Sequence, residues 1–204
     1  MNHDLTVYIV DDDAAVRDAL GLLLGIQGYR IALFANGGDF LQAWRPAWAG
    51  CLLVDIRMPV IDGLTLQRKL IELDCHLPVV MMTGHGEVEQ ARQAFKANAV
   101  DFLEKPLDEQ RLIKAIEEAF ARQQAALSEG REQAEARQLL AQLTPREREV
   151  MQLVIGGMHN RDIGPALAIS VRTVEVHKAR LMSKLGVGNV ADLVRISMAA
   201  GAQP

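Results

Sequence analysis

Cysteine and aromatic residues are scarce in this chain. Only two of the 204 residues are cysteine, Cys51 and Cys75, and they do not form a C-x-x-C pair. This usage favours free thiols in a reducing cytoplasm over a disulfide scaffold. Aromatic residues make up 4% of the chain, half of the residues are apolar and 24% are charged. That composition is typical of a globular protein and excludes a disordered one.

Long hydrophobic runs are also missing. No apolar run approaches the ~18 residues that a membrane helix needs. The first ten residues, MNHDLTVYIV, lack the basic region and the long apolar core of a signal peptide. We therefore expect a cytoplasmic protein with no membrane partner.

Positive charge is deficient in the first part of the chain and in excess in the last. Residues 1–122 carry 12 Lys and Arg against 18 Asp and Glu, whereas residues 141–204 carry 8 against 5. The net charges are therefore −6 and +3. Such an asymmetry suggests two modules, the second with a polyanionic partner.

Short apolar runs alternate with amphipathic stretches through residues 4–122. Each run is nearly continuous in apolar residues, as expected for a strand that is covered on both faces. The runs are Thr6–Val10, Arg30–Phe34, Cys51–Val54, Val79–Met82 and Val100–Leu103. Alternation of strands and helices predicts a doubly wound α/β domain with a five-stranded parallel sheet, as in flavodoxin-like folds.

The rest of the chain contains helical patterns and no strand signals. Residues 107–142 favour one long or interrupted helix, of which 123–140 would be a solvated linker between the domains. Thr144, Pro145 and Glu147 form a capping box at the start of a second domain, residues 141–204. Within it we predict four helices, at 145–156, 160–167, 171–185 and 189–200.

Polar side chains gather where the predicted strands end. Asp11 and Asp12 follow the first strand, Asp55 ends the third, Thr83 follows the fourth and Lys105 follows the fifth. The carboxyl ends of parallel strands share one edge of the sheet, where ligands bind, so these groups can converge. Asp13, the third aspartate of the run, is expected only to cap the following helix.

These residue types suit phosphoryl chemistry. Carboxylate oxygens suit Mg²⁺, while a lysine and a hydroxyl can neutralise and hydrogen-bond phosphoryl oxygens. A carboxylate can itself be the nucleophile and form an aspartyl phosphate. The five positions and their intervals resemble the receiver domain of two-component response regulators. The resemblance implies that Asp55 accepts a phosphoryl group from a sensor histidine kinase.

The resemblance also implies roles for the neighbouring residues. Asp12 and Asp55, with the backbone carbonyl of Arg57, would ligate Mg²⁺, and Asp11 would help through water. Lys105 would contact the phosphoryl group and Thr83 would move toward it, followed by rotation of Phe102. The Lys105–Pro106 bond is expected to be cis. His85, two residues after Thr83, is expected either to tune dephosphorylation or to line the rim of the site.

The basic domain carries a helix-turn-helix pattern, with the turn at ALAIS. It resembles the LuxR-type DNA-binding domain, and together with the receiver it resembles the FixJ/NarL group of response regulators. The resemblance implies a four-helix domain that enters the major groove as a dimer. Glu175, Val176 and Ala179 would face bases, and Arg172, Thr173 and Lys178 would mostly hold phosphates.

The helix-turn-helix departs from the usual pattern of this family in three ways. His159 stands where Ser is common at the cap of the first helix, so Asn160 is expected to cap it instead. Gly164 and Pro165 lie inside that helix, where Pro165 removes a backbone donor and can bend it. Ala168 replaces a glycine that is common in the turn.

The leading hypothesis is a transcription factor that is switched by phosphorylation, with promoter DNA and RNA polymerase as partners. Phosphorylation would drive dimerisation through the face formed by residues 87–106, or would unmask the basic domain. A DNA-binding regulator that ignores phosphorylation is one alternative. A Mg²⁺-dependent aspartyl phosphohydrolase is another, although Asp55 lacks the D-x-D-x-T signature of such enzymes. The basic domain could also bind a protein instead of DNA.

Overall fold

The computed structural model describes residues 5–84 and 99–201. The chain divides into two compact units, Met1–Ala126 and Leu127–Pro204, which we describe separately. Within the described residues, no helix is long and apolar enough to span a membrane.

The first unit contains a five-stranded parallel sheet, as predicted. In the order β2-β1-β3-β4-β5, the strands are β1 (Thr6–Val10), β2 (Arg30–Phe34), β3 (Gly50–Asp55), β4 (Val79–Thr83) and β5 (Asp101–Glu104). Among residues 5–84 and 99–126, the helices are α1 (Ala14–Ile26), α2 (Gly37–Ala43), α3 (Gly63–Glu72) and the first part of α5 (Glu109–Ala141). The order in which β1 and β3 are neighbours puts the topological switch point between these two strands.

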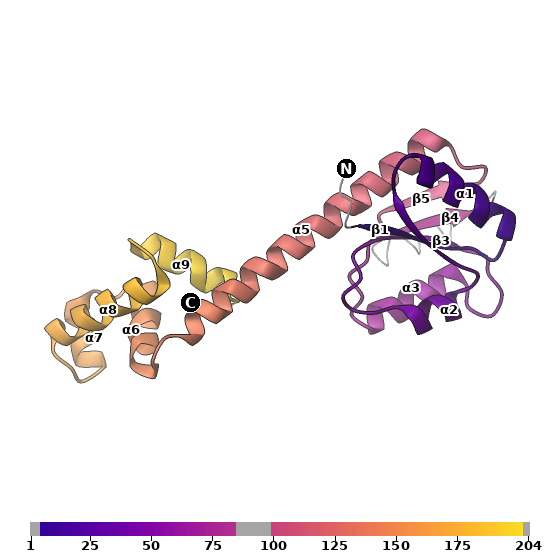
Figure 1. Cartoon of the computed structure of the whole chain (residues 1–204). Helices are drawn as coiled ribbons and strands as arrows, with labels where there is room; N and C mark the ends of the chain where they lie inside the picture. The colour runs from indigo at the N-terminus through magenta and orange to yellow at the C-terminus, as the bar shows by residue number, and fades with distance from the viewer. Residues whose placement is uncertain (1–4, 85–98, 202–204) are drawn as a thin grey trace. The chain divides into compact units, whose positions relative to one another are not determined.

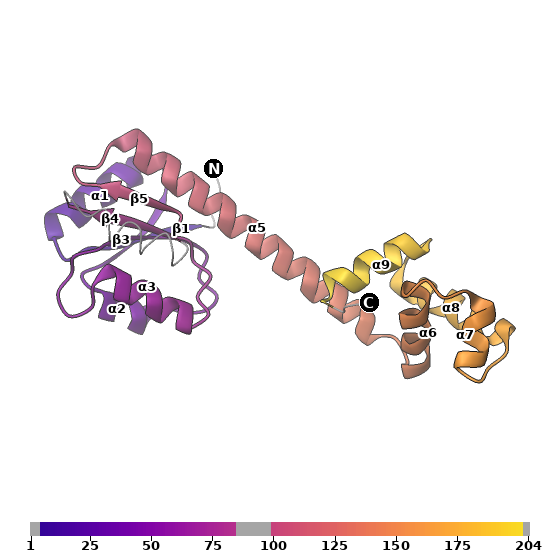
Figure 2. The ribbon, with the colours of Figure 1, turned by 180° about the vertical axis from the view of Figure 1, so that it is seen from behind.

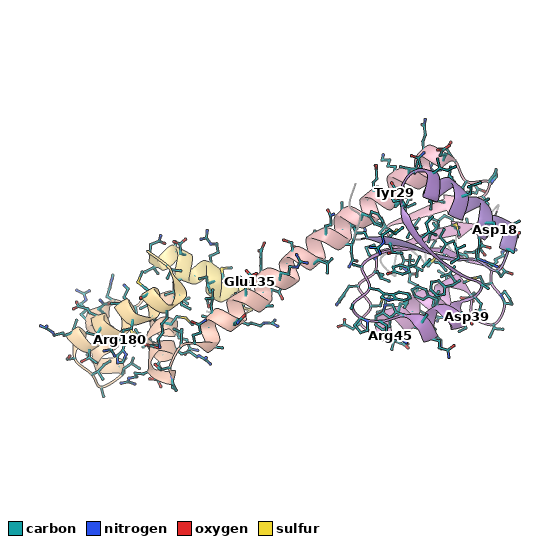
Figure 3. The ribbon with its side chains drawn as sticks, viewed as in Figure 1. Asp18, Tyr29, Asp39, Arg45, Glu135 and Arg180 are labelled. Carbon is teal, nitrogen blue, oxygen red and sulfur yellow. The ribbon has the colours of Figure 1, made fainter. Side chains whose placement is uncertain are left out.

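Helices cover both faces of the sheet (Figures 1 and 2). Val7 and Ile9 point to one face and pack under α1 and α5, whereas Tyr8 and Val10 point to the other, under α2 and α3. Tyr29, labelled in Figure 3, packs edge-on against Phe120 of α5 at 5.8 Å between ring centroids. The alternation of side chains along β1 therefore places every second residue in each of two apolar layers.

The strands differ from the sequence prediction in the exposure of β2 and in several bounds: β3 and β4 end one residue later, at Asp55 and Thr83, and β5 is displaced by one residue, to Asp101–Glu104. β2 is an edge strand with Arg30 and Leu33 exposed, so the expectation that every strand is covered on both faces is wrong for it. β3 begins one residue early, at Gly50, which pairs with Thr6. Gly50 has φ +147°, and a Cβ there would lie 1.8 Å from the carbonyl oxygen of Thr6. Only glycine permits this close approach.

The long helix α5 runs without a break through the predicted linker. Residues 124–135 are all exposed, as expected for a solvated helix. Its last turns behave differently, because Ala136 is buried and Leu139 and Leu140 pack into the core of the second unit.

The second unit adds four helices, α6 (Pro145–Ile155), α7 (Asn160–Ala166), α8 (Val171–Leu185) and α9 (Val190–Ala199). Each lies within one residue of its predicted bounds. The capping box of α6 is present, since Thr144 accepts from the Glu147 N–H and Glu147 accepts from the Thr144 N–H. The expectation that Asn160 caps α7 is wrong: His159 occupies the cap position, without a side-chain hydrogen bond. Pro165 lies within α7.

Candidate functional site

The carboxyl edge of the sheet brings together three charged side chains from three strands. Asp11 directly follows β1, Asp55 is the last residue of β3, and Lys105 directly follows β5. The ammonium of Lys105 lies 2.7 Å from Asp11 Oδ2 and 2.5 Å from Asp55 Oδ1. The convergence predicted from the strand ends is therefore present for these residues.

This cluster is largely withdrawn from solvent. The side chains of Asp11 and Asp55 are 1% and 7% exposed, and that of Lys105 is 26% exposed. Burial raises the pKa of Asp55 above its usual value; Lys105 opposes this rise and the negative charge of Asp11 adds to it. Burial lowers the pKa of Lys105, but hydrogen bonds to both carboxylates outweigh it and hold that pKa above its usual value.

Backbone contacts fix Asp11 in place. Its Oδ1 accepts a hydrogen bond of 2.9 Å from the Asp13 N–H, and its carbonyl accepts one of 2.7 Å from Arg17. Asp13 in turn caps α1 by accepting from the Ala15 N–H at 2.8 Å, as predicted. The role of Arg17 was missed in the sequence, where its only signal was its place six residues after Asp11.

The other predicted residues surround this cluster at various depths. Thr83 ends β4, is 2% exposed, and its hydroxyl donates to the Gly84 carbonyl at 3.1 Å. Asp12 is exposed, and Phe102 is half-buried against the core under α2 and α3. The Arg57 N–H donates to the Asp55 carboxylate, and the Lys105–Pro106 bond is cis as expected. His85 lies outside the described residues.

The second unit presents α8 as an exposed cationic helix. Ser170 caps it by accepting from the Thr173 N–H at 3.1 Å. Its buried side consists of Val174, Leu181 and Leu185. The opposite side exposes the residues Arg172, Glu175, Val176, Ala179 and Arg180, the last of which is labelled in Figure 3.

Lys178 lies on the flank of α8 instead of its exposed side. It lines a groove together with His159 and Arg161 at the start of α7 and Val190 at the start of α9. Of the six residues predicted to contact DNA, five therefore lie on or beside the exposed side of α8, and Lys178 lies in this groove.

Comparison with known families accounts for both units. The model of the response regulator receiver domain matches residues 7–117, and that of the bacterial regulatory proteins of the luxR family matches residues 141–197. The chain is a response regulator. It belongs to the group that joins a receiver domain to a LuxR-type DNA-binding domain.

Relatives of this response regulator match it over nearly its whole length. It is 40% identical over 195 residues to the transcriptional regulatory protein FixJ of Bradyrhizobium diazoefficiens, covering 96% of this chain and 95% of FixJ. It is 42% identical over 190 residues to the tetrathionate response regulatory protein TtrR of Salmonella typhimurium, covering 93% and 90%.

Solved structures give the same assignment. The response regulator StyR matches with a TM-score of 0.85 at 38% identity, covering 96% of this chain and 98% of StyR. Full-length FixJ from B. japonicum matches with a TM-score of 0.60 at 38% identity over all of both chains.

Receiver domains generally bind Mg²⁺, and the residues of this response regulator fit that ion. Two buried carboxylates share one ammonium, so the cluster of Asp11, Asp55 and Lys105 retains one uncompensated negative charge. Burial raises the pKa of Asp55 above its usual value, and the negative charge of Asp11 adds to this rise. In the part of the chain that the structure describes, no three His, Cys, Asp or Glu side chains already form a metal cage. Mg²⁺ does not require one, because it commonly takes one or two carboxylates and keeps several waters.

Proposed function

We propose that this response regulator is phosphorylated on Asp55 by a sensor histidine kinase and that phosphorylation switches its binding to promoter DNA. The observation that carries the proposal is the position of Asp55, at the end of a central strand and 2.5 Å from the ammonium of Lys105. A buried carboxylate beside a fixed cation can attack phosphorus while the cation stabilises the charge on the phosphoryl oxygens.

Three residues of the chain take different roles in the phosphoryl transfer. An oxygen of Asp55 forms the new bond to phosphorus as the bond from phosphorus to the kinase histidine nitrogen breaks. Lys105 pairs with a phosphoryl oxygen, and Thr83 exchanges its hydrogen bond with the Gly84 carbonyl for one to the phosphoryl group. Rotation of Phe102 into space vacated by Thr83 would follow, because the ring is only half-buried.

Asp12, Asp55 and the Arg57 carbonyl would hold Mg²⁺, with Asp11 acting through water. The ion, when bound, neutralises phosphoryl oxygens and so lowers the barrier to transfer. Asp11 suits the outer position because the Asp13 N–H and Lys105 already occupy both of its carboxylate oxygens. Asp12, being exposed, has its carboxylate available for direct coordination.

An apolar stripe on α1 offers a docking surface for the kinase. Leu22 and Ile26 lie one turn apart and are 68% and 77% exposed. Both residues lie in the second half of α1, so a partner that covers this stripe would contact the receiver along a helix whose other end adjoins the acidic run. Exposed apolar residues grouped in this way are typical of protein interaction sites.

The output is DNA binding by α8 in the major groove. Glu175, Val176 and Ala179 would contact bases, while Arg172, Thr173 and Lys178 would hold phosphates. We keep residues 87–106 as the dimerisation face; residues 87–98 of that face lie outside the described residues. RNA polymerase is the proposed downstream partner at the promoter.

Substitution of the acceptor tests the proposal. The wild-type chain, given acetyl phosphate and Mg²⁺, should be retarded on a phosphate-affinity gel and should bind more tightly to a duplex that it selects from a random-sequence pool. Asp55→Asn should show neither effect. Asp13→Asn, which keeps a capping side chain, is the matched control and should behave as the wild type.

The possible results separate the alternatives. Phosphorylation of Asp55→Asn would show that another residue is the acceptor. A phosphorylated wild type with unchanged DNA affinity would favour a regulator that ignores phosphorylation. No salt-sensitive binding to any duplex would refute the DNA-binding role.

A further inference from the structure

The turn that leads into the recognition helix is held by a residue from a different helix. Arg146, in the first turn of α6, donates a hydrogen bond from Nη2 to the carbonyl of Leu167, the residue that ends α7. Its Nη1 pairs with Glu149 at 2.6 Å, and its side chain is 35% exposed. The guanidinium therefore joins α6 to the turn between α7 and α8.

Backbone hydrogen bonds from Ala168 to Pro165 and from Ile169 to Gly164 close this turn, but two features of its sequence weaken it. α7 has only seven residues, and one of them, Pro165, has no N–H to donate. Ala168 follows with φ 54°, a left-handed conformation that is unfavourable for alanine. No basic side chain lies in the last turn of α7. Arg146 therefore supplies, from a different helix, the positively charged donor that the last turn of α7 does not contain.

The turn is also tightly packed, so a small shift in it changes the start of α8. The Ile169 N–H donates to the Gly164 carbonyl at 2.9 Å, and a Cβ on Gly164 would lie 3.0 Å from the Ile169 carbonyl oxygen. Ser170, the next residue, is the cap of α8. Displacement of Leu167 would thus be passed through two residues to the helix that faces DNA.

Glu147, the residue after Arg146, contacts the other end of α8. Glu147 pairs with Lys184, in the last turn of α8, at 2.6 Å. Two consecutive residues of α6 therefore attach to the turn before α8 and to its final turn. Contacts near both ends of α8 fix its orientation relative to α6.

We propose that Arg146 is a positioning residue for DNA recognition, which sets the orientation of α8 by capping the end of α7. It acts through the turn and makes no contact with DNA. The inference rests on the proposed DNA-binding function. Removal of the Arg146 side chain should therefore weaken binding most on the preferred DNA sequence. Base contacts depend on the orientation of α8 more strongly than phosphate contacts do.

The test compares the full-length wild type with Arg146→Ala on two duplexes, the one that the wild type selects from a random pool and a scrambled version of it. We expect roughly tenfold weaker binding to the selected duplex and a smaller loss on the scrambled one. The slope of affinity against salt concentration should stay unchanged. Amide hydrogen exchange at Ile169 should be faster, because its hydrogen bond closes the turn.

Two further variants complete the design. Glu149→Ala removes the ion-pair partner of Arg146 but leaves its bond to Leu167, so it should bind as the wild type. Adding Ala168→Gly to Arg146→Ala should recover part of the lost affinity, because glycine adopts the left-handed conformation without strain. If Arg146→Ala does not fold, Arg146→Lys replaces it, with an intermediate loss expected.

The outcomes separate this inference from the function on which it rests. Absence of binding by the wild type itself would refute the DNA-binding role. With a wild type that binds, unchanged affinity of Arg146→Ala, or no recovery by Ala168→Gly, would overturn the positioning role. A fall of about one in the salt slope would instead make Arg146 a phosphate contact.

Discussion

The ammonium of Lys105 lies 2.5 Å from the carboxylate of Asp55, the residue that we propose as the phosphoryl acceptor. The same ammonium is 2.7 Å from Asp11. Lys105 thus lies between two buried carboxylates, of which Asp55 would also ligate Mg²⁺ in the proposed site. In the proposed reaction, this ammonium would exchange one of these contacts for a contact with the phosphoryl group.

Removal of this cation should change how the receiver responds to magnesium. Lys105→Met leaves two buried carboxylates without their ammonium, so without Mg²⁺ the free energy of unfolding should fall by about 1–3 kcal/mol. Added Mg²⁺ should then stabilise the variant more than the wild type, because the competing ammonium is gone. Urea denaturation with and without Mg²⁺ measures both effects. Lys114→Met, on the exposed side of α5, is the control and should leave both values unchanged.

The ion pair between Glu147 and Lys184 makes the stability of the DNA-binding domain depend on pH. Hydrogen bonds from Lys184 and from the Thr144 backbone lower the pKa of Glu147 from 4.5 to about 2. A carboxyl with a lowered folded-state pKa contributes stability that is complete above pH 4.5 and is lost as pH falls toward 2. Glu147→Gln should therefore be less stable than the wild type at pH 7, and the difference should shrink across that window.

Thermal denaturation at a series of pH values measures this difference. Glu149→Gln is the matched control, because the Glu149 side chain is 48% exposed and its pair with Arg146 should contribute much less. A gap between the wild type and Glu147→Gln that stays constant down to pH 2 would contradict the role assigned to the carboxylate.

The acidic site could be predicted from the sequence because topology alone aligns strand ends. Once alternating strands and helices indicate a parallel sheet, Asp11, Asp55 and Lys105 must lie at one edge whatever the details of packing. Their pairing through one ammonium could not be predicted, since it depends on how far each side chain extends. The contact of Arg146 with Leu167, 21 residues away, was hidden for the same reason.

Local rules were reliable where one residue decides the outcome. Asp13 and Thr144 cap helices as their residue types predict. The rule failed at α7, where Asn160 was expected to cap and His159 occupies that position without a hydrogen bond. Edge exposure of β2 was missed because strand order is a property of the whole sheet, and an apolar run does not reveal it.

Val60 is strained and its side chain is fully exposed, so glycine should improve on it. This β-branched residue has φ 68° in the loop that follows β3, and it is 102% exposed. Val60→Gly should raise the free energy of unfolding of the receiver by about 1 kcal/mol, since glycine reaches this conformation without a Cβ clash. Val176→Gly, at an exposed position inside α8, is the contrasting variant and should destabilise its domain. Equal destabilisation in both would show that Val60 is not strained.

The apolar stripe on α1, Leu22 and Ile26, should affect the rate of phosphotransfer from a histidine kinase but not the rate of phosphorylation by acetyl phosphate. Leu22→Glu places a charge on a side chain that is 68% exposed, so folding should be retained. Phosphotransfer from the histidine kinase that phosphorylates the wild type fastest in a panel should slow at least tenfold, a loss on the order of 1.4 kcal/mol. The rate with acetyl phosphate should not change. Leu73→Glu, at a side chain that is 50% exposed, is the control; a similar loss in this control would argue against a specific docking role for α1.

Phosphate contacts and base contacts made by α8 should be distinguishable, because the former depend on salt concentration and the latter on the DNA sequence. Arg172 is exposed in the first turn of α8, where a phosphate contact would position the helix. Arg172→Ala should weaken binding to selected and scrambled duplexes alike and reduce the salt slope by about one. Glu175→Gln should instead leave the slope nearly unchanged and alter which base the chain selects, because a carboxylate accepts from cytosine N4 whereas an amide also donates. Repeating the random-pool selection with each variant measures both results, and an altered base preference in Arg172→Ala would reverse the two assignments.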